Sequence, residues 1–167
     1  PTSNDSTDEA HETVDLSVGG IAAVGTIVDN DGAPSIQSVS DASVTEGGDL
    51  VHTVTLSNAS SSPTTFAYTQ GGGTATGGGT DYTTPPTFSN GVTLALGILT
   101  VPANVTSFTI TTPTTLDTID EGASENYNLS VGGVAATGTI TDDDSAPSIS
   151  TVSSNSATEA SNIVHTV

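Results

Sequence analysis

Residues 14–36 read VDLSVGGIAAVGTIVDNDGAPSI, and residues 127–149 read YNLSVGGVAATGTITDDDSAPSI. The two stretches are offset by 113 residues, and about 25 of the 41 positions aligned over 14–54 and 127–167 are identical. Identity of this density indicates an internal repeat. A period of 113 residues is the size of a β-sandwich domain and is too long for one coil of a solenoid.

The repeat also sets the expected domain organisation. Upstream of the quoted stretch, and across a one-residue gap, Asp5, Asp8 and Glu9 align with Asp117, Asp120 and Glu121. We therefore expect residues 1–32 to be the C-terminal part of a preceding repeat, residues 33–144 to be a complete repeat, and residues 145–167 to begin the following one. This division predicts a longer parent protein with several copies in series.

Short apolar alternations separated by turn residues predict an all-β fold. The chain is rich in Val, Ile and Thr, and no segment shows the apolar stripe of an amphipathic helix. A Gly- and Thr-rich loop is expected at 71–80. About seven strands with intervening turns predict an antiparallel sandwich of two sheets. The expected strands of the complete repeat are 35–39, 50–56, 65–69, 98–101, 106–111, 127–131 and 135–141.

The charge balance of the chain is one-sided. Nineteen Asp and Glu residues are present with no Lys or Arg, so the formal net charge is -19. Nucleic-acid binding requires basic side chains that replace phosphate counterions, and attachment to anionic lipid requires a basic cluster, so both are excluded. No apolar run is long enough to span a membrane. The repulsion between clustered carboxylates must be relieved by bound cations or by spreading into solvent.

The acidic residues are clustered rather than scattered. Asp117, Asp120, Glu121 and Glu125 share one connection between expected strands, and residues 142–144 (DDD) follow the last strand. Asp81 follows the Gly-rich loop, and Glu46 follows the first expected strand. Ca²⁺ accepts 6–8 oxygen ligands in irregular loops in general, whereas zinc prefers His or Cys. The oxygen-only supply favours calcium at one end of the sandwich, and the alternative is a solvated acidic surface.

Five stretches of the chain, taken in order, resemble the Calx-β repeat of sodium–calcium exchangers, integrin β4 and bacterial surface proteins. These stretches are TEGG at 45–48, GTATGGGTDY at 73–82, LTVPANVTSFTI at 99–110, DTIDEGASENYNLSV at 117–131 and GTITDDD at 138–144. The resemblance covers about 35–144 and implies an immunoglobulin-like sandwich. Several members of this family bind Ca²⁺ at the loop end. The resemblance implies that the ligands are Glu46, Asp81, Asp117, Asp120, Glu121, Asp142, Asp143 and Asp144.

The chain departs from the family pattern in two places. Residues 87–96 (TFSNGVTLAL) read as an insertion, and Thr118 stands where the exchanger domains carry another acid, which is expected to reduce the number of bound ions. The preceding partial repeat has DND at 29–31 where the complete repeat has DDD. We expect its site to be incomplete unless an adjacent chain supplies oxygens. Its candidate ligands are Asp5, Asp8, Glu9, Asp29 and Asp31.

The expected function is that of a structural repeat module in a long extracellular adhesin or filament of a bacterial surface or secreted protein. Calcium at the repeat junctions would stiffen the chain, and the partners would be neighbouring repeats and other copies in a filament. One alternative is a calcium-sensing or ligand-binding module, and another is a filament subunit joined by strand exchange. No enzyme is expected, because no nucleophile–base arrangement or substrate motif appears in the sequence. His52 and His165 occupy the same repeat position inside a strand pattern, so these histidines, like His11, are expected to be structural or surface residues.

Overall fold

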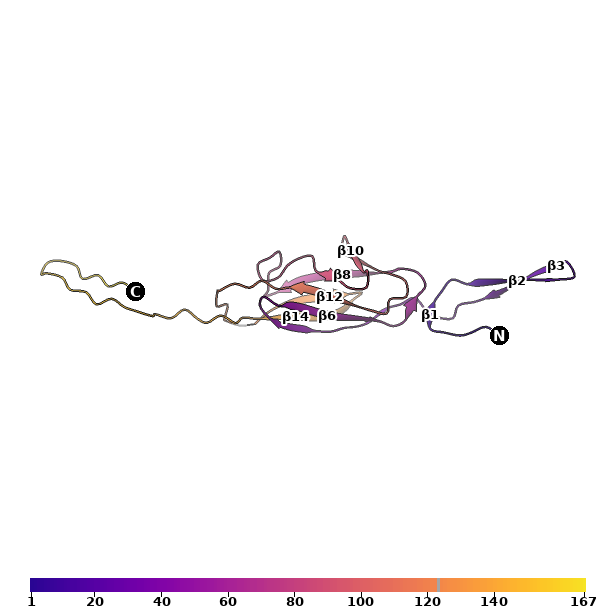
Figure 1. The fold of residues 1–167 in the computed structure, drawn as a ribbon, viewed down its shortest axis with the longest axis horizontal. Coiled ribbons are helices and arrows are strands. Elements are labelled where there is room, and N and C mark those ends of the chain that lie inside the picture. The colour runs from indigo at the N-terminus through magenta and orange to yellow at the C-terminus, as the bar shows by residue number, and fades with distance from the viewer. Residues whose placement is uncertain (123) are drawn as a thin grey trace.

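The computed structural model describes residues 1–122 and 124–167. Its two larger sheets lie in the middle of an elongated molecule (Figure 1). One sheet has the order β10-β11-β8-β13-β14-β5 and the other has the order β4-β6-β12-β9. The first contains β5 (Ala42–Thr45), β8 (Thr64–Gly73), β10 (Thr93–Ala95), β11 (Ile98–Val101), β13 (Glu125–Val131) and β14 (Val134–Thr141). The second contains β4 (Ile36–Val39), β6 (Asp49–Leu56), β9 (Thr87–Phe88) and β12 (Ser107–Pro113).

This sheet order confirms the predicted all-β sandwich and makes it immunoglobulin-like. The strands β4, β6, β12 and β9 take the places of the A, B, E and D strands, while β8, β13 and β14 take those of C, F and G. Within these two sheets, one pairing among the described residues differs from the antiparallel prediction, because β5 runs parallel to β14 at the edge of the larger sheet. The chain crosses from one sheet to the other between β4 and β5, which splits the first strand in two.

The core lies between the two sheets and follows the alternation of the sequence. Leu50, His52, Val54 and Leu56 of β6 all point inward and are buried, while the residues between them are exposed or half-buried. His52 is the polar member of this row, and its Nε2 lies 2.9 Å from the hydroxyl of the buried Tyr127 on the opposite sheet. The histidine therefore joins the two layers, in agreement with the structural role expected from its place in a strand.

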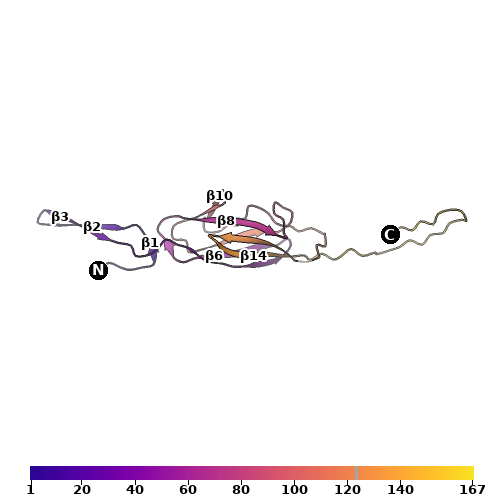
Figure 2. The ribbon, with the colours of Figure 1, turned by 180° about the vertical axis from the view of Figure 1, so that it is seen from behind.

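The segment before the sandwich reproduces its last hairpin. Strands β2 (Glu12–Val18) and β3 (Ile21–Ile27) pair in the register that β13 and β14 use, position for position across the 113-residue offset. Leu16 is 58% exposed, whereas its equivalent Leu129 is 1% exposed. The same hairpin is thus built in both places, but no strand in the described part of the chain covers the apolar side of β2–β3 (Figure 2).

The segment after the sandwich reproduces two contacts of the sandwich without forming a strand. His165 Nδ1 lies 2.6 Å from the Ser153 carbonyl oxygen, as His52 Nδ1 lies 2.7 Å from that of Ser40. The Thr166 amide donates to the Ser153 hydroxyl, and the Thr53 amide donates to that of Ser40. These contacts are therefore present in a segment that forms no strand.

Several sequence-based expectations are corrected by the structure. Residues 71–73, assigned to a loop, lengthen β8 and pair with β13. Strands β5, β9 and β10 were not expected, and the last two lie in the stretch interpreted as an insertion. Two short strands, β1 (Thr7–Asp8) and β7 (Ala59–Ser60), were also not expected. The described residues include no helix of the length and apolarity needed to cross a membrane.

Candidate metal centre

Two groups of three carboxylates form at the end of the sandwich where β5 and β14 finish. Glu46, Asp117 and Asp144 each place one oxygen within 4.8 Å of the others, and so do Asp81, Glu121 and Glu125. We call these the first and the second trio. None of the six side chains has a Lys or Arg to pair with, because the chain contains neither.

The parallel edge pairing explains how the first trio forms. Thr45 of β5 is in register with Thr141 of β14, so both strands finish at the same level. The Glu46 amide then donates to the Thr141 carbonyl oxygen at 3.0 Å. This contact brings Glu46 beside the acidic segment that follows β14, and the Asp143 amide lies 3.4 Å from Glu46 Oε1.

The second trio is assembled around Asp81. The Asp81 carboxylate accepts a short hydrogen bond from the Thr76 amide, and its carbonyl oxygen accepts one from the Thr115 amide at 2.9 Å. Asp81 is thereby tied both to the Gly-rich loop and to the segment that follows β12. Glu125, the first residue of β13, completes the trio together with Glu121.

Asp142 organises the loop that carries these acids. Its Oδ2 accepts hydrogen bonds from the amides of Glu121 at 2.9 Å and Gly122 at 3.1 Å, and its Oδ1 accepts one from the Asp144 amide at 2.9 Å. The bond from Asp144 is the chief reason that the pKa of Asp142 falls below its ordinary value. Asp142 therefore remains ionised and holds the acidic segments against the end of β14.

Two carboxylate oxygens in the trios, Glu125 Oε2 and Asp144 Oδ2, are buried and have no hydrogen-bond partner among the described residues. Burial, followed by the charge of Asp81, raises the pKa of Glu125 from 4.5 to about 7. Burial, followed by the charges of Asp143 and Asp142, raises the pKa of Asp144. Burial is also the first cause of the raised pKa of Glu46 and Glu121. Ionising these four carboxylates therefore carries an energetic cost that a bound cation would relieve.

The predicted ligands fall into three sets. Five of the eight from the complete repeat lie in the two trios, and these are Glu46, Asp81, Asp117, Glu121 and Asp144. Asp142 lies between the trios and is bonded to backbone amides. Asp120 and Asp143 belong to neither trio; Asp120 lines a hollow with Asp142 and Asp144, and Asp143 is exposed.

Glu125 is the member of the trios that was not among the predicted ligands. It lies in the same acidic connection as Glu121, so its type and place were visible in the sequence. The signal that it belonged to the site was the equivalent Glu12 at the start of β2, 113 residues earlier.

The acids of the preceding partial repeat form a similar loop without a trio of their own among the described residues. Asp29 accepts hydrogen bonds from the amides of Glu9 at 2.9 Å and Asp31 at 3.2 Å, as Asp142 does at the equivalent positions. Asp5 Oδ1 accepts one from the Thr7 amide at 2.8 Å, which matches the bond from Ile119 to Asp117 at 2.7 Å. The repeat therefore encodes the shape of the loop, whereas the equivalents of Glu46 and Asp81 would precede residue 1.

Comparisons with known proteins show a likeness to immunoglobulin-like domains. No protein-family model matches the chain, and no curated protein matches it. One similar structure is the solution structure of an Ig-like domain of human obscurin-like protein 1, which is 15% identical in sequence. The match covers 73% of this chain and 96% of that domain, with a TM-score of 0.32. A second is a structure of titin kinase and its flanking domains, which is 12% identical in sequence. This match covers 74% of this chain and 20% of the titin chain, with a TM-score of 0.27.

Proposed function

We propose that the chain is a structural repeat module of a long extracellular adhesin or filament, and that Ca²⁺ bound between the carboxylates of the two trios stiffens the acidic end of each repeat. The observation that carries the proposal is the pair of trios at one end of the sandwich, with two buried carboxylate oxygens that lack a partner. The resemblance to the Calx-β repeat supports the same assignment. The partners would be neighbouring repeats and other copies in a filament.

The chemistry of the donors favours calcium over other divalent ions. All six side chains offer carboxylate oxygens, and backbone carbonyls and water complete an irregular shell of the kind that Ca²⁺ accepts. Mg²⁺ requires a near-regular octahedron and holds its water strongly, and zinc selects His or Cys, which the trios lack. Asp142 fixes the shape of the loop, and the six carboxylates would supply the charge.

Calcium should stabilise the folded chain by a measurable amount. An ion that binds only the folded state at a hundredfold excess over its dissociation constant contributes about 2.7 kcal/mol per site. For a domain of this size, that is a rise in melting temperature of roughly 10 °C. The test is thermal unfolding followed by circular dichroism in EDTA and in calcium, with the bound metal counted by elemental analysis of the dialysed protein.

A pair of matched variants makes the test specific. Asp144→Asn removes a charge from the first trio and should reduce the calcium-dependent rise, whereas Asp15→Asn removes a charge from the exposed part of β2 and should leave it unchanged. Asn is the residue that the complete repeat carries at the equivalent position, Asn128. If calcium raised the melting temperature of both variants equally, or if the parent chain bound no metal, the calcium site would be refuted.

The concentration at which calcium acts separates the extracellular rod from a sensor. Saturation near millimolar calcium fits a module that is permanently loaded outside the cell. A change of shape at micromolar calcium, measured by small-angle scattering, would instead favour the calcium-sensing alternative.

A further inference from the structure

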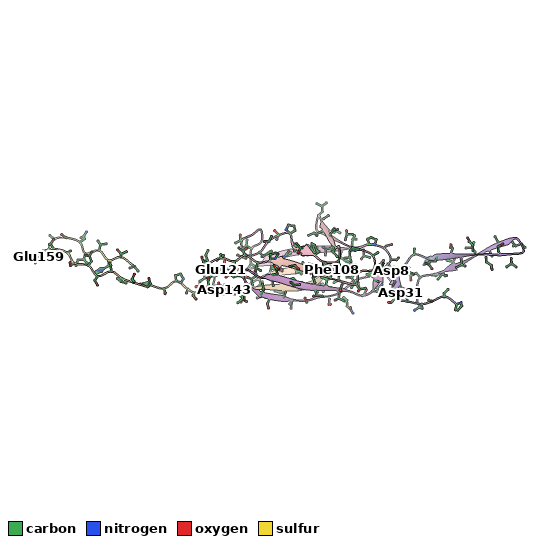
Figure 3. The ribbon with its side chains drawn as sticks, in the orientation of Figure 1. Asp8, Asp31, Phe108, Glu121, Asp143 and Glu159 are labelled. Carbon is green, nitrogen blue, oxygen red and sulfur yellow. The ribbon has the colours of Figure 1, made fainter. Side chains whose placement is uncertain are left out.

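The end of the preceding repeat is joined to the complete sandwich by a small parallel sheet. Strand β1 pairs with β7, with Thr7 opposite Ala59 and Asp8 opposite Ser60. Figure 3 shows Asp8 and Asp31 against the end of the sandwich opposite to Glu121 and Asp143. The acidic loop of one repeat is thus in contact with a loop of the next, residues 57–61, which we call the receiving loop.

The contact is made by uncharged donors and oxygen acceptors. The Ser60 hydroxyl donates to Asp8 Oδ2 at 2.9 Å, and the Ser61 amide donates to the Asp8 carbonyl oxygen at 2.9 Å. The Asn58 side-chain amide donates to the Gly32 carbonyl oxygen at 2.8 Å. These three bonds hold two separate points of the preceding repeat.

The receiving loop is itself anchored in the sandwich. Ser60 is only 4% exposed, and its carbonyl oxygen accepts a hydrogen bond from the Asn104 amide at 2.8 Å. The Ser62 amide also donates to the Ser60 hydroxyl. A rigid attachment of this kind transmits the orientation of the sandwich to the segment bound on it.

The equivalent acidic loop at the other end of the complete repeat lacks this pairing. Ile119 and Asp120 align with Thr7 and Asp8 but form no strand, and Ile119 is 65% exposed. The equivalent of the receiving loop would come after Val167, which aligns with Val54. The same short segment is therefore paired where a receiving loop is present and unpaired where the described residues contain none.

We propose that the receiving loop is the surface by which each repeat binds the acidic loop of the repeat before it, without a metal ion, and that Asp120 makes the same contact with a following repeat. The partner is another repeat of this type, presented end to end in one direction. Two acidic loops cannot replace this arrangement, because their like charges repel and neither offers a Ser60 hydroxyl. The proposal is independent of calcium binding in the trios.

The absence of cysteine allows the junction to be measured directly. Spin labels on Ser17→Cys in β2 and Thr69→Cys in β8 report the distance between hairpin and sandwich by pulsed electron paramagnetic resonance. In EDTA we expect a narrow distance distribution in the parent chain. A distribution that is broad in EDTA and narrows only in calcium would overturn the proposal, because the junction would then be held by metal.

Two substitutions of Asp8 distinguish a hydrogen bond from a charge effect. Both Asp8→Asn and Asp8→Ala remove the negative charge, but only Asn keeps an oxygen that accepts from Ser60. We expect the distribution to stay narrow in Asp8→Asn and to broaden in Asp8→Ala. Broadening in both variants would show that the carboxylate acts through its charge, and a narrow distribution in both would show that the junction needs neither the charge nor the bond from Ser60; either result would refute the role of this hydrogen bond.

A second pair of variants tests the receiving loop. Ser60→Ala removes the donor, whereas Ser61→Ala removes an exposed hydroxyl and keeps the backbone amide that binds Asp8. Loss of one hydrogen bond should raise the population of the open junction roughly fivefold to tenfold, seen as faster hydrogen exchange at the amide of residue 61 in Ser60→Ala. Unchanged exchange in Ser60→Ala, with the melting temperature of the sandwich preserved, would refute the role of Ser60.

Discussion

Replacing Glu125 by Gln should stabilise the chain without calcium and weaken its response to calcium. Glu125 starts β13, its Oε2 is buried without a partner, and the carboxylate faces Asp81 and Glu121 in the second trio. Gln has the same shape and no charge. The substitution therefore removes the repulsion in EDTA, and it also removes one of the carboxylates proposed to hold the ion.

The size of the effect follows from the pKa of Glu125. A rise from 4.5 to about 7 sets an upper limit of ~3 kcal/mol on the cost of ionising this group in the folded chain. Since the side chain is only partly buried, solvent screening reduces this to about 1 kcal/mol. Because the folded chain binds the proton more tightly than the unfolded chain, metal-free stability should fall as the pH rises from about 4.5 to 7.

The assay is urea unfolding of the parent chain and Glu125→Gln at pH 5 and pH 8, each in EDTA and in calcium. In EDTA at pH 8 the variant should be more stable by about 1 kcal/mol, and at pH 5 the difference should shrink. In calcium at pH 8 the parent chain should instead be more stable than Glu125→Gln. If the variant were no more stable than the parent in EDTA at pH 8, or if the order were the same with and without calcium, the reasoning would be refuted.

Three further substitutions test the fold and the loop. Gly138→Ala should destabilise the sandwich by about 1–3 kcal/mol in urea unfolding, because the added methyl meets the Tyr127 ring, whereas Gly25→Ala, at the equivalent place in the exposed hairpin, should be neutral. Tyr127→Phe should cost about 1–3 kcal/mol in the same assay, because His52 Nε2 loses its partner in the core. Asp142→Ala should speed hydrogen exchange at the three amides it accepts from, and calorimetry should show weaker calcium binding.

The sequence predicted several strands in which apolar and polar residues alternate. Residues 50–56 are all part of β6, and 98–101 are the whole of β11, because each places apolar side chains on one face at a spacing of two. Strands β9 and β10 have 2 and 3 residues, too few to show an alternation. Their pairing depends on β12 and β11, which a local pattern does not reveal.

The sequence predicted which residue types form the candidate metal centre, but it did not predict which of them lie together in each trio. The repeat and the charge imbalance marked the acidic segments. The division into two trios depends on the parallel pairing of β5 with β14 and on the place of Glu125 at the start of β13, and both are tertiary features. Asp142 has the same side chain as its neighbours Asp143 and Asp144, so its bonds to backbone amides could not be assigned from the sequence.

The distribution of charge along the molecule explains why an ion and a polar junction would have different roles. The acidic loops lie at opposite ends of the sandwich, separated by strands such as β6 and β14 of 8 residues each, or about 26 Å (Figure 3). Since charges are screened beyond about 8 Å at physiological salt, the repulsion is a separate local problem in each loop. The receiving loop brings Ser60 and Asn58, which fix position but add no positive charge. Loss of the ion should therefore raise the repulsion within a loop and leave its junction to the next repeat in place.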